Sequence, residues 1–278
     1  FNSSGETVIH SEDLERLVSS VRDPMYRTGF DRNLWLWEQY SPESTYLMVA
    51  DVARGDGADF SVFHIVKLET MEIIGEYRGK PNLEEFATIL DTTGREFGNC
   101  LLVVENNSLG ISILEKLQDR EYPNLYHSIK GTHEYVDQIQ AEGLNNSIAG
   151  FTTSSKTRPL IVAKMEEFIR NKLITVYSSR LVDEFKTFIW NNNRAQAMRS
   201  YHDDLVMALA IGCWVRDTAL TTNQRDLEYK RAMVGSMMLK SKTFQTQNPG
   251  SKVMQQGLTQ EQREIQNSYQ EFAWLFKG

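Results

Sequence analysis

The sequence predicts an α/β domain with a mixed central β-sheet flanked by helices. Three β-type segments joined by short turns follow one another within residues 46–78, which indicates an antiparallel meander. Strand-like and helical patterns then alternate over residues 82–120, as in a parallel extension of the same sheet. Residues 203–217 lack a polar face, so a buried helix is expected to close the core.

The composition is that of an ordinary globular protein. The 278 residues are 41% hydrophobic and 24% charged, and Cys100 and Cys213 stand in apolar runs without a CxxC partner, as expected in a reducing compartment. No apolar stretch of the given sequence is long enough to span a membrane, and its first residues have neither the basic nor the apolar region that is typical of a secretory signal. Because the chain begins at Phe1, we expect a fragment of a longer protein.

Charge is unevenly distributed. The formal net charge of −7 argues against general nucleic-acid binding, but residues 151–200 contain nine Lys or Arg and four Asp or Glu. This basic segment is either a local docking face for phosphates or a solvated surface.

Three regions are expected. Residues 1–40 read as a lead-in segment with a short helix capped by Ser11, and residues 41–217 as the core. Residues 218–278 are rich in Gln, Ser, Thr and Lys, which predicts a helix-and-linker appendage.

The core elements follow in order. Strands are predicted at 46–53, 60–68, 72–78, 101–104 and 174–177, with a tight glycine-bearing turn at 54–59. Helices are predicted at 82–97 (capped by Asn82), 108–120, 156–172, 179–187 and 203–217. Residues 121–155 are expected to be irregular, and 191–193 to form a turn.

Acidic residues stand at the edges of strongly apolar sequence. Asp51 lies in the first core strand, Glu105 ends the run LLVV, and Asp203 and Asp204 open the buried helix. An unpaired charge is costly in such places, so convergence of these carboxylates at one sheet edge is expected. For the two aspartates, helix capping is the alternative explanation.

Clustered carboxylates raise one another's pKa unless a cation neutralises them, and oxygen-rich clusters suit Mg²⁺ or Mn²⁺. Two such ions about 4 Å apart activate a water and stabilise the leaving oxygen in phosphodiester hydrolysis. No side-chain nucleophile is then required.

An Asp in the first strand of a meander, a Glu after the following parallel strand and an Asp at a C-terminal helix are the arrangement of the ribonuclease H-like nuclease fold. The stretches MVADVARGDGADFSVFHIV, LLVVENNSLG and YHDDLVMALAIGCW together resemble the nuclease domain of the large terminase subunit of myovirus-type tailed bacteriophages. The resemblance covers roughly residues 40–217.

This resemblance implies that Asp51, Glu105 and Asp204 are the catalytic, metal-binding carboxylates. Asp51 would bridge two ions, and Glu105 and Asp204 would each hold one. Asp203 or the auxiliary acid Asp59 would complete the site, and the sequence does not decide which of Asp203 and Asp204 points inward.

Other polar residues near these motifs are candidates for supporting roles in the site. His202 is expected to orient a carboxylate or a water, or to have no such role, and His64 is expected to be a core or edge histidine. Asn106 and Asn107 either orient Glu105 or form a strand-end turn. Six basic residues are candidates for contacting DNA phosphates: Arg54, Lys80, Lys156, Arg158, Arg194 and Arg199.

The resemblance further implies an endonuclease that cuts concatemeric viral double-stranded DNA during genome packaging in the host cytoplasm, with little sequence preference. Its partners would be an N-terminal ATPase domain, the portal protein and the small terminase subunit. No GxxxxGK[ST] motif occurs, so the chain is expected to be an excised nuclease domain, with residues 218–278 facing the portal.

Three rival interpretations remain. A Holliday-junction resolvase or transposase would use the same acidic triad, and a DNA- or portal-docking module would keep the fold without activity. An actin- or sugar-kinase-like domain also begins with an Asp in its first strand, but it needs a Gly-rich phosphate loop with hydroxyl side chains, which is absent here.

Overall fold

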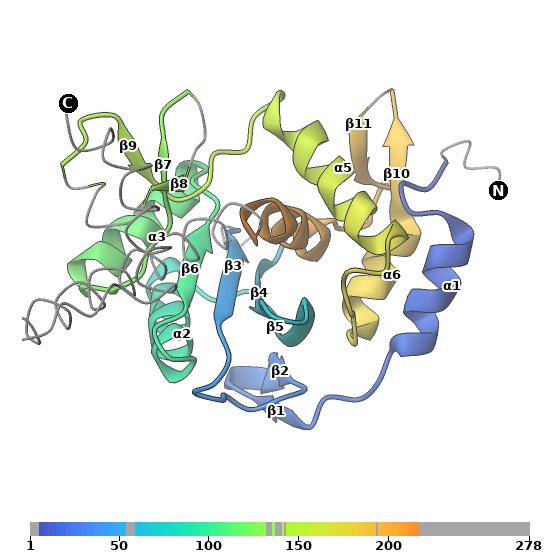
Figure 1. Ribbon diagram of the computed structural model, residues 1–278, viewed down its shortest axis with the longest axis horizontal. Helices are drawn as coiled ribbons and strands as arrows, with labels where there is room; N and C mark the ends of the chain where they lie inside the picture. The colour runs from blue at the N-terminus through green and yellow to red at the C-terminus, as the bar shows by residue number, and fades with distance from the viewer. Residues whose placement is uncertain are drawn as a thin grey trace, which may run out of the picture. The chain divides into compact units, whose positions relative to one another are not determined.

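A six-stranded sheet forms the centre of the molecule. The computed structural model describes residues 6–216 except 54–58, 132–134, 137–140, 142 and 193. The strand order is β1-β2-β5-β4-β3-β6 (Figure 1). The strands are β1 (Tyr26–Thr28), β2 (Leu34–Leu36), β3 (Tyr46–Asp51), β4 (Ser61–Lys67), β5 (Glu72–Gly79) and β6 (Leu101–Val104).

The pairing directions agree with the predicted mixed sheet. Strands β3, β4 and β5 form an antiparallel meander, whereas β6 runs parallel to β3. Strands β1 and β2 come from the segment interpreted as a lead-in and extend the same sheet: β2 pairs antiparallel with β5, and β1 pairs antiparallel with β2. The short helix η1 (Phe30–Arg32) connects them.

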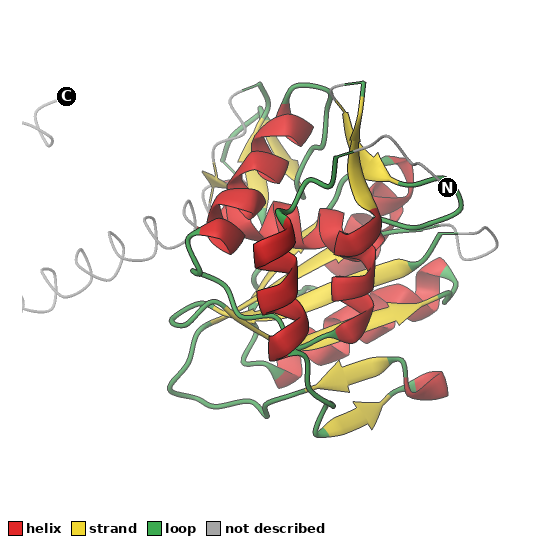
Figure 2. Cartoon of the chain, turned by 90° about the vertical axis from the view of Figure 1, so that its right-hand side faces the viewer, coloured by secondary structure: helices red, strands yellow, loops and turns green. Residues whose placement is uncertain are grey.

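Helices cover both faces of this sheet, as Figures 1 and 2 show. Helices α2 (Leu83–Glu96) and α3 (Ser108–Asp119) pack on one face. Helices α1 (Ser11–Ser20), α5 (Thr157–Arg170), α6 (Ser179–Thr187) and the helix of residues 204–216 pack on the other.

Side-chain alternation along the strands separates two apolar clusters. In β3, Leu47 and Val49 belong to the cluster under the 204–216 helix, whereas Met48 and Ala50 belong to the cluster under α2 and α3. All four side chains are fully buried, which explains why the strand is apolar on both faces.

The start of a helix was predictable where the capping side chain lies next to the helix in the sequence. Asn82 caps α2, as predicted, and the structure adds a capping box with Glu85. The prediction for Ser11 is wrong, because Ser11 is the first residue of α1 and the cap position is His10, which makes no side-chain capping bond.

The region 121–155 is less irregular than predicted. It contains a small antiparallel sheet of β8 (Tyr135–Val136), β7 (His127–Ile129) and β9 (Ser147–Ala149). Strands of two or three residues are too short to show a period in the sequence.

Three further predictions concern other segments of the chain. Strands β10 (Phe188–Asn191) and β11 (Arg194–Ala197) pair in a hairpin on either side of the predicted turn at 191–193. The predicted strand at 174–177 is reduced to one parallel bridge between Thr175 and Glu72. Residues 54–58 and 218–278, for which a turn and an appendage were predicted, lie outside the described residues.

Within the described part of the chain, no helix has the length and apolar character that a membrane span requires.

Candidate active site

The register of two parallel strands brings Asp51 and Glu105 together. Ala50 of β3 pairs with Val104 of β6, and the Glu105 N–H donates to the Ala50 carbonyl at 3.0 Å. Alternate residues of a strand share one face of the sheet, so Asp51 lies on the same face as Leu47 and Val49, and Glu105 on the same face as Leu101 and Val103. Both carboxylates therefore lie on the face that the 204–216 helix covers.

Glu105 is held by the residues that follow it. The Asn107 side chain donates from Nδ2 to Glu105 Oε2 at 3.1 Å, and its Oδ1 accepts from the N–H groups of Leu109 and Gly110 at the start of α3. Asn107 thus caps the helix and orients the carboxylate at once. Asn106 instead donates to the Ala149 carbonyl at 3.2 Å.

Gly110 allows this close packing of α3 against the strand end. A methyl group at this position would overlap the Glu105 carbonyl oxygen. We expect Gly110→Ala to destabilise the fold by about 1–3 kcal/mol through overpacking and to lower any activity that depends on Glu105. Thermal denaturation of this variant beside Gln118→Ala, an exposed change in the same helix, checks the prediction. Equal melting temperatures for the two variants would contradict it.

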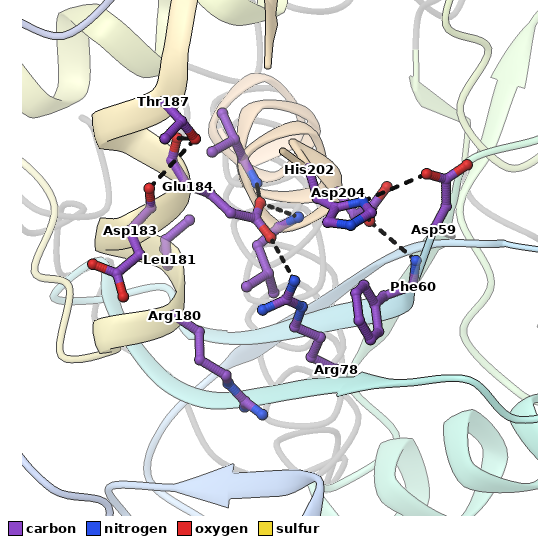
Figure 3. Close-up of polar contacts among 12 residues, drawn as sticks. Asp59, Phe60, Arg78, Arg180, Leu181, Asp183, Glu184, Thr187, His202 and Asp204 are labelled. Carbon is purple, nitrogen blue, oxygen red and sulfur yellow. Dashed lines mark hydrogen bonds and ion pairs between the residues drawn. The ribbon is translucent and has the colours of Figure 1, made fainter. Parts of the chain in front are cut away.

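The start of the 204–216 helix places Asp204 beside the sheet. Asp204 Oδ2 accepts the Phe60 N–H at 3.1 Å, which ties the helix to the residue before β4. His202 Nδ1 lies 3.8 Å from Asp204 Oδ2 and 3.5 Å from Asp59 Oδ1 (Figure 3). Asp59, His202 and Asp204 each offer a donor atom, and these atoms lie within 4.8 Å of one another.

Asp203 points elsewhere. Its Oδ2 accepts from Arg158 Nη2 at 2.7 Å, and the same guanidinium also donates to the Ala195 carbonyl. The choice that the sequence left open is therefore answered geometrically: Asp204 faces the acidic cluster, and Asp203 pairs with α5. We find no interaction that brings Asp203 to Asp51 or Glu105 among the described residues.

Neither aspartate side chain caps the helix; the cap comes from Glu184 of α6. Glu184 Oε2 accepts the N–H groups of Leu205 at 2.9 Å and Val206 at 3.3 Å. Its side chain is 6% exposed, and Arg78 Nη2 lies 3.9 Å from its other oxygen (Figure 3). Glu184 was not predicted as a site residue, although it stands at the same helical spacing as the buried Leu181 and Phe185, where a charged residue is unusual.

Burial and mutual repulsion act on these carboxyl groups. Burial, the charge of Glu105, a hydrogen bond with Glu105 and the charge of Asp204 raise the pKa of Asp51 well above its usual range. Burial also raises the pKa of Asp204, although the Phe60 N–H opposes the shift. Burial raises the pKa of Glu184 to about 8, against the opposing effect of Arg78.

The donor set fits a hard divalent cation. Carboxylates that raise one another's pKa gain most from a neutralising charge, and the oxygen donors with one imidazole nitrogen suit Mg²⁺ or Mn²⁺. Asp59, His202 and Asp204 are the described residues whose donor atoms converge closely enough for one ion, and Asp51 and Glu105 form an adjoining carboxylate pair.

The predicted DNA-contacting residues are spread over several places. Arg158 and Arg194 line a pocket of about 460 Å³ with Trp190, between α5 and the β10–β11 hairpin. Lys156 and Arg199 are exposed, and Arg54 lies outside the described residues. Lys80 Nζ lies 4.6 Å from the centre of the Phe60 ring, near Asp204.

Two contacts near Asp204 were not anticipated. The Arg78 guanidinium lies 4.1 Å from the centre of the Phe60 ring, and the His202 ring meets that ring edge to face at 5.3 Å. His64, predicted to be a core or edge histidine, is fully buried, and its Nε2 bonds the Leu205 carbonyl at 2.9 Å. These contacts pack β4 and β5 against the helix that carries Asp204.

No protein-family model matches the sequence. Among solved structures, the large terminase nuclease of thermophilic phage G20c with bound magnesium is similar, with a TM-score of 0.55 and 20% identity over 76% of this chain and 98% of that chain. A second structure of that nuclease gives a TM-score of 0.55 and 19% identity over 74% and 96% of the two chains. The cobalt-bound form of that nuclease gives a TM-score of 0.53 and 20% identity over 72% of this chain and 95% of that chain.

This likeness confirms the predicted fold class. The chain has the mixed α/β, ribonuclease H-like fold of the large terminase nuclease domain. The matched structures do not separate one type of tailed phage from another, so the myovirus assignment stays a prediction.

Proposed function

We propose that the chain is a metal-dependent DNA endonuclease of the terminase type, which hydrolyses phosphodiester bonds. The observation that carries the proposal is the meeting of Asp51 and Glu105 at one strand edge, with Asp204 close enough for its charge to act on Asp51. The fold of the phage G20c nuclease supports the same activity.

Each residue has a proposed role. The charges of Glu105 and Asp204 both act on Asp51, so Asp51 would be the ligand that two ions share. Glu105 would complete one ion's ligands, and Asp204 with Asp59 and His202 would complete the other's. When bound, the ions supply activation of water and stabilisation of the leaving oxygen. Magnesium and cobalt in the G20c nuclease support the choice of a divalent metal.

The proposed substrate and partners are those that the resemblance to terminase nucleases implies. We propose that double-stranded concatemeric viral DNA is cut in the host cytoplasm, within a machine that also contains an ATPase domain, the portal protein and the small terminase subunit. The basic residues Arg158, Arg194, Lys156 and Lys80 would contact backbone phosphates, so DNA affinity should fall as the salt concentration rises.

Plasmid cleavage tests the proposal. Supercoiled and linear plasmid are incubated with the protein in Mg²⁺, in Mn²⁺ and in EDTA. We expect nicking and linearisation with either metal and none in EDTA, because the carboxylate cluster cannot activate water without a cation. Isothermal titration with Mn²⁺ is run in parallel. Absence of both cleavage and Mn²⁺ binding would contradict the proposal and favour a docking module of the same fold.

A further inference from the structure

The backbone of Leu205, directly after Asp204, is bound by buried polar side chains at both its N–H and its carbonyl group. Its N–H donates to Glu184 Oε2 at 2.9 Å, and its carbonyl bonds His64 Nε2 at 2.9 Å. A carbonyl only accepts, so His64 donates from Nε2. Glu184 comes from α6 and His64 from β4, so the two contacts fix the start of the 204–216 helix against two separate elements.

Residues at a helix start ordinarily supply their own cap. The Asp203 carbonyl accepts the Met207 N–H at 2.8 Å, which makes Asp203 the cap position by its backbone. Its side chain nevertheless binds Arg158, and Glu184 receives the N–H groups of Leu205 and Val206 that an Asp at the cap position would take. Glu184 therefore fixes the backbone of the two residues that follow Asp204, while Asp203 pairs with Arg158 and Asp204 lies close enough to Asp51 for their charges to interact.

We propose that Glu184 is a positioning residue: its buried carboxyl caps the 204–216 helix from outside and thereby holds the Asp204 carboxylate in the metal-binding geometry. This inference rests on the proposed metal-dependent function. Within the described residues Glu184 makes no hydrogen bond or ion pair with a predicted metal ligand, although the charge of Asp204 acts on it, so the positioning effect passes through the backbone of Leu205 and Val206. Groups that orient the ligands of a metal commonly change its affinity by about 10- to 100-fold when they are removed.

Two replacements of Glu184 separate the hydrogen bond from the volume of the side chain. Gln keeps an oxygen that accepts N–H groups, whereas Leu keeps a side chain of comparable size without an acceptor. Asp183→Leu is the matched control, because Asp183 is the adjacent residue of α6 and is exposed, with its carboxylate paired to Lys186 at 2.8 Å. Asp204→Asn gives the reference for a damaged metal site.

Titration of each full chain with Mn²⁺, well below its melting temperature, is the first measurement. We expect E184L to weaken Mn²⁺ binding about tenfold or more, and E184Q and D183L to stay within about threefold of wild type. In the metal-free proteins, amide hydrogen exchange at Leu205 and Val206 should be faster in E184L than in E184Q. DNA affinity in EDTA should be unchanged in both, which a generally unfolded chain would not show.

The possible results lead to distinct conclusions. Equal Mn²⁺ affinity in E184L and wild type would overturn the positioning role, and so would equal weakening by Leu and Gln, since the acceptor would then be irrelevant. If wild type binds no Mn²⁺, or if D204N binds it as tightly as wild type, the proposed metal site itself fails and the positioning inference fails with it. Weakening confined to E184L and D204N supports both.

Discussion

Asp51→Asn is expected to lower metal-dependent DNA cleavage by about a thousandfold or more, which corresponds to about 4 kcal/mol of transition-state stabilisation. Asn is nearly isosteric but carries no charge, so it cannot supply the negative charge that both ions would share at position 51. The effect should be the largest of any single substitution, because Asp51 interacts with both Glu105 and Asp204. Plasmid cleavage rates in Mg²⁺ and Mn²⁺ measure it.

Asp119→Asn is the control for this substitution, since Asp119 is an exposed carboxylate at the end of α3 on the opposite face of the sheet. It should cleave as wild type does. DNA binding in EDTA should persist in Asp51→Asn, because loss of a negative charge does not remove phosphate contacts. Cleavage by Asp51→Asn within tenfold of wild type, on the order of 1.4 kcal/mol, would place the reaction elsewhere in the protein.

Asp204→Asn and Asp203→Asn should differ sharply although the residues are adjacent. Asp204 faces the cluster and accepts the Phe60 N–H, so its amide variant should lose about a hundredfold or more in cleavage and bind Mn²⁺ more weakly. Asp203 pairs with Arg158 in a salt bridge whose carboxylate side is 25% exposed. Such a bridge is worth about 1 kcal/mol or less, so Asp203→Asn should lose less than about tenfold.

Cleavage rates and Mn²⁺ affinities of the two variants, measured side by side, test this contrast. An equal loss of cleavage and of Mn²⁺ binding in both would show that Asp203 also serves the metal site. A larger loss in Asp203→Asn than in Asp204→Asn would reverse the assignment that we make from the hydrogen bonds.

The sheet was predictable because its signals are local. A strand that is buried on both faces is a continuous apolar run, and the turn signals between such runs are short, so β3, β4, β5 and β6 could be located from the sequence. The capping box at Asn82 is also confined to four residues. The strands β7, β8 and β9 have two or three residues each, and their pairing depends on partners elsewhere in the fold.

In the candidate site, too, features of one short segment were predictable and contacts between distant segments were not. Asp51, Glu105 and Asp204 were found because each stands at the boundary of an apolar run, a feature of one short segment. The orientation of Asp203 depends on Arg158, which is 45 residues away, and the cap on Leu205 comes from Glu184, 21 residues away. Contacts of this kind arise only from tertiary packing, so the sequence could name the two aspartates but not choose between them.

Phe60 and Asp204 are 144 residues apart in the sequence, yet their hydrogen bond joins the sheet to the last described helix. A polypeptide emerging from the ribosome completes its N-terminal part first. The residues of the meander and β6 are synthesised before the helix that carries Asp204, so a nascent chain that ends before residue 204 contains Asp51 and Glu105 but lacks their third carboxylate. The order of synthesis therefore delays completion of the acidic cluster until nearly all of the described fold exists, and a prematurely terminated chain could not possess it.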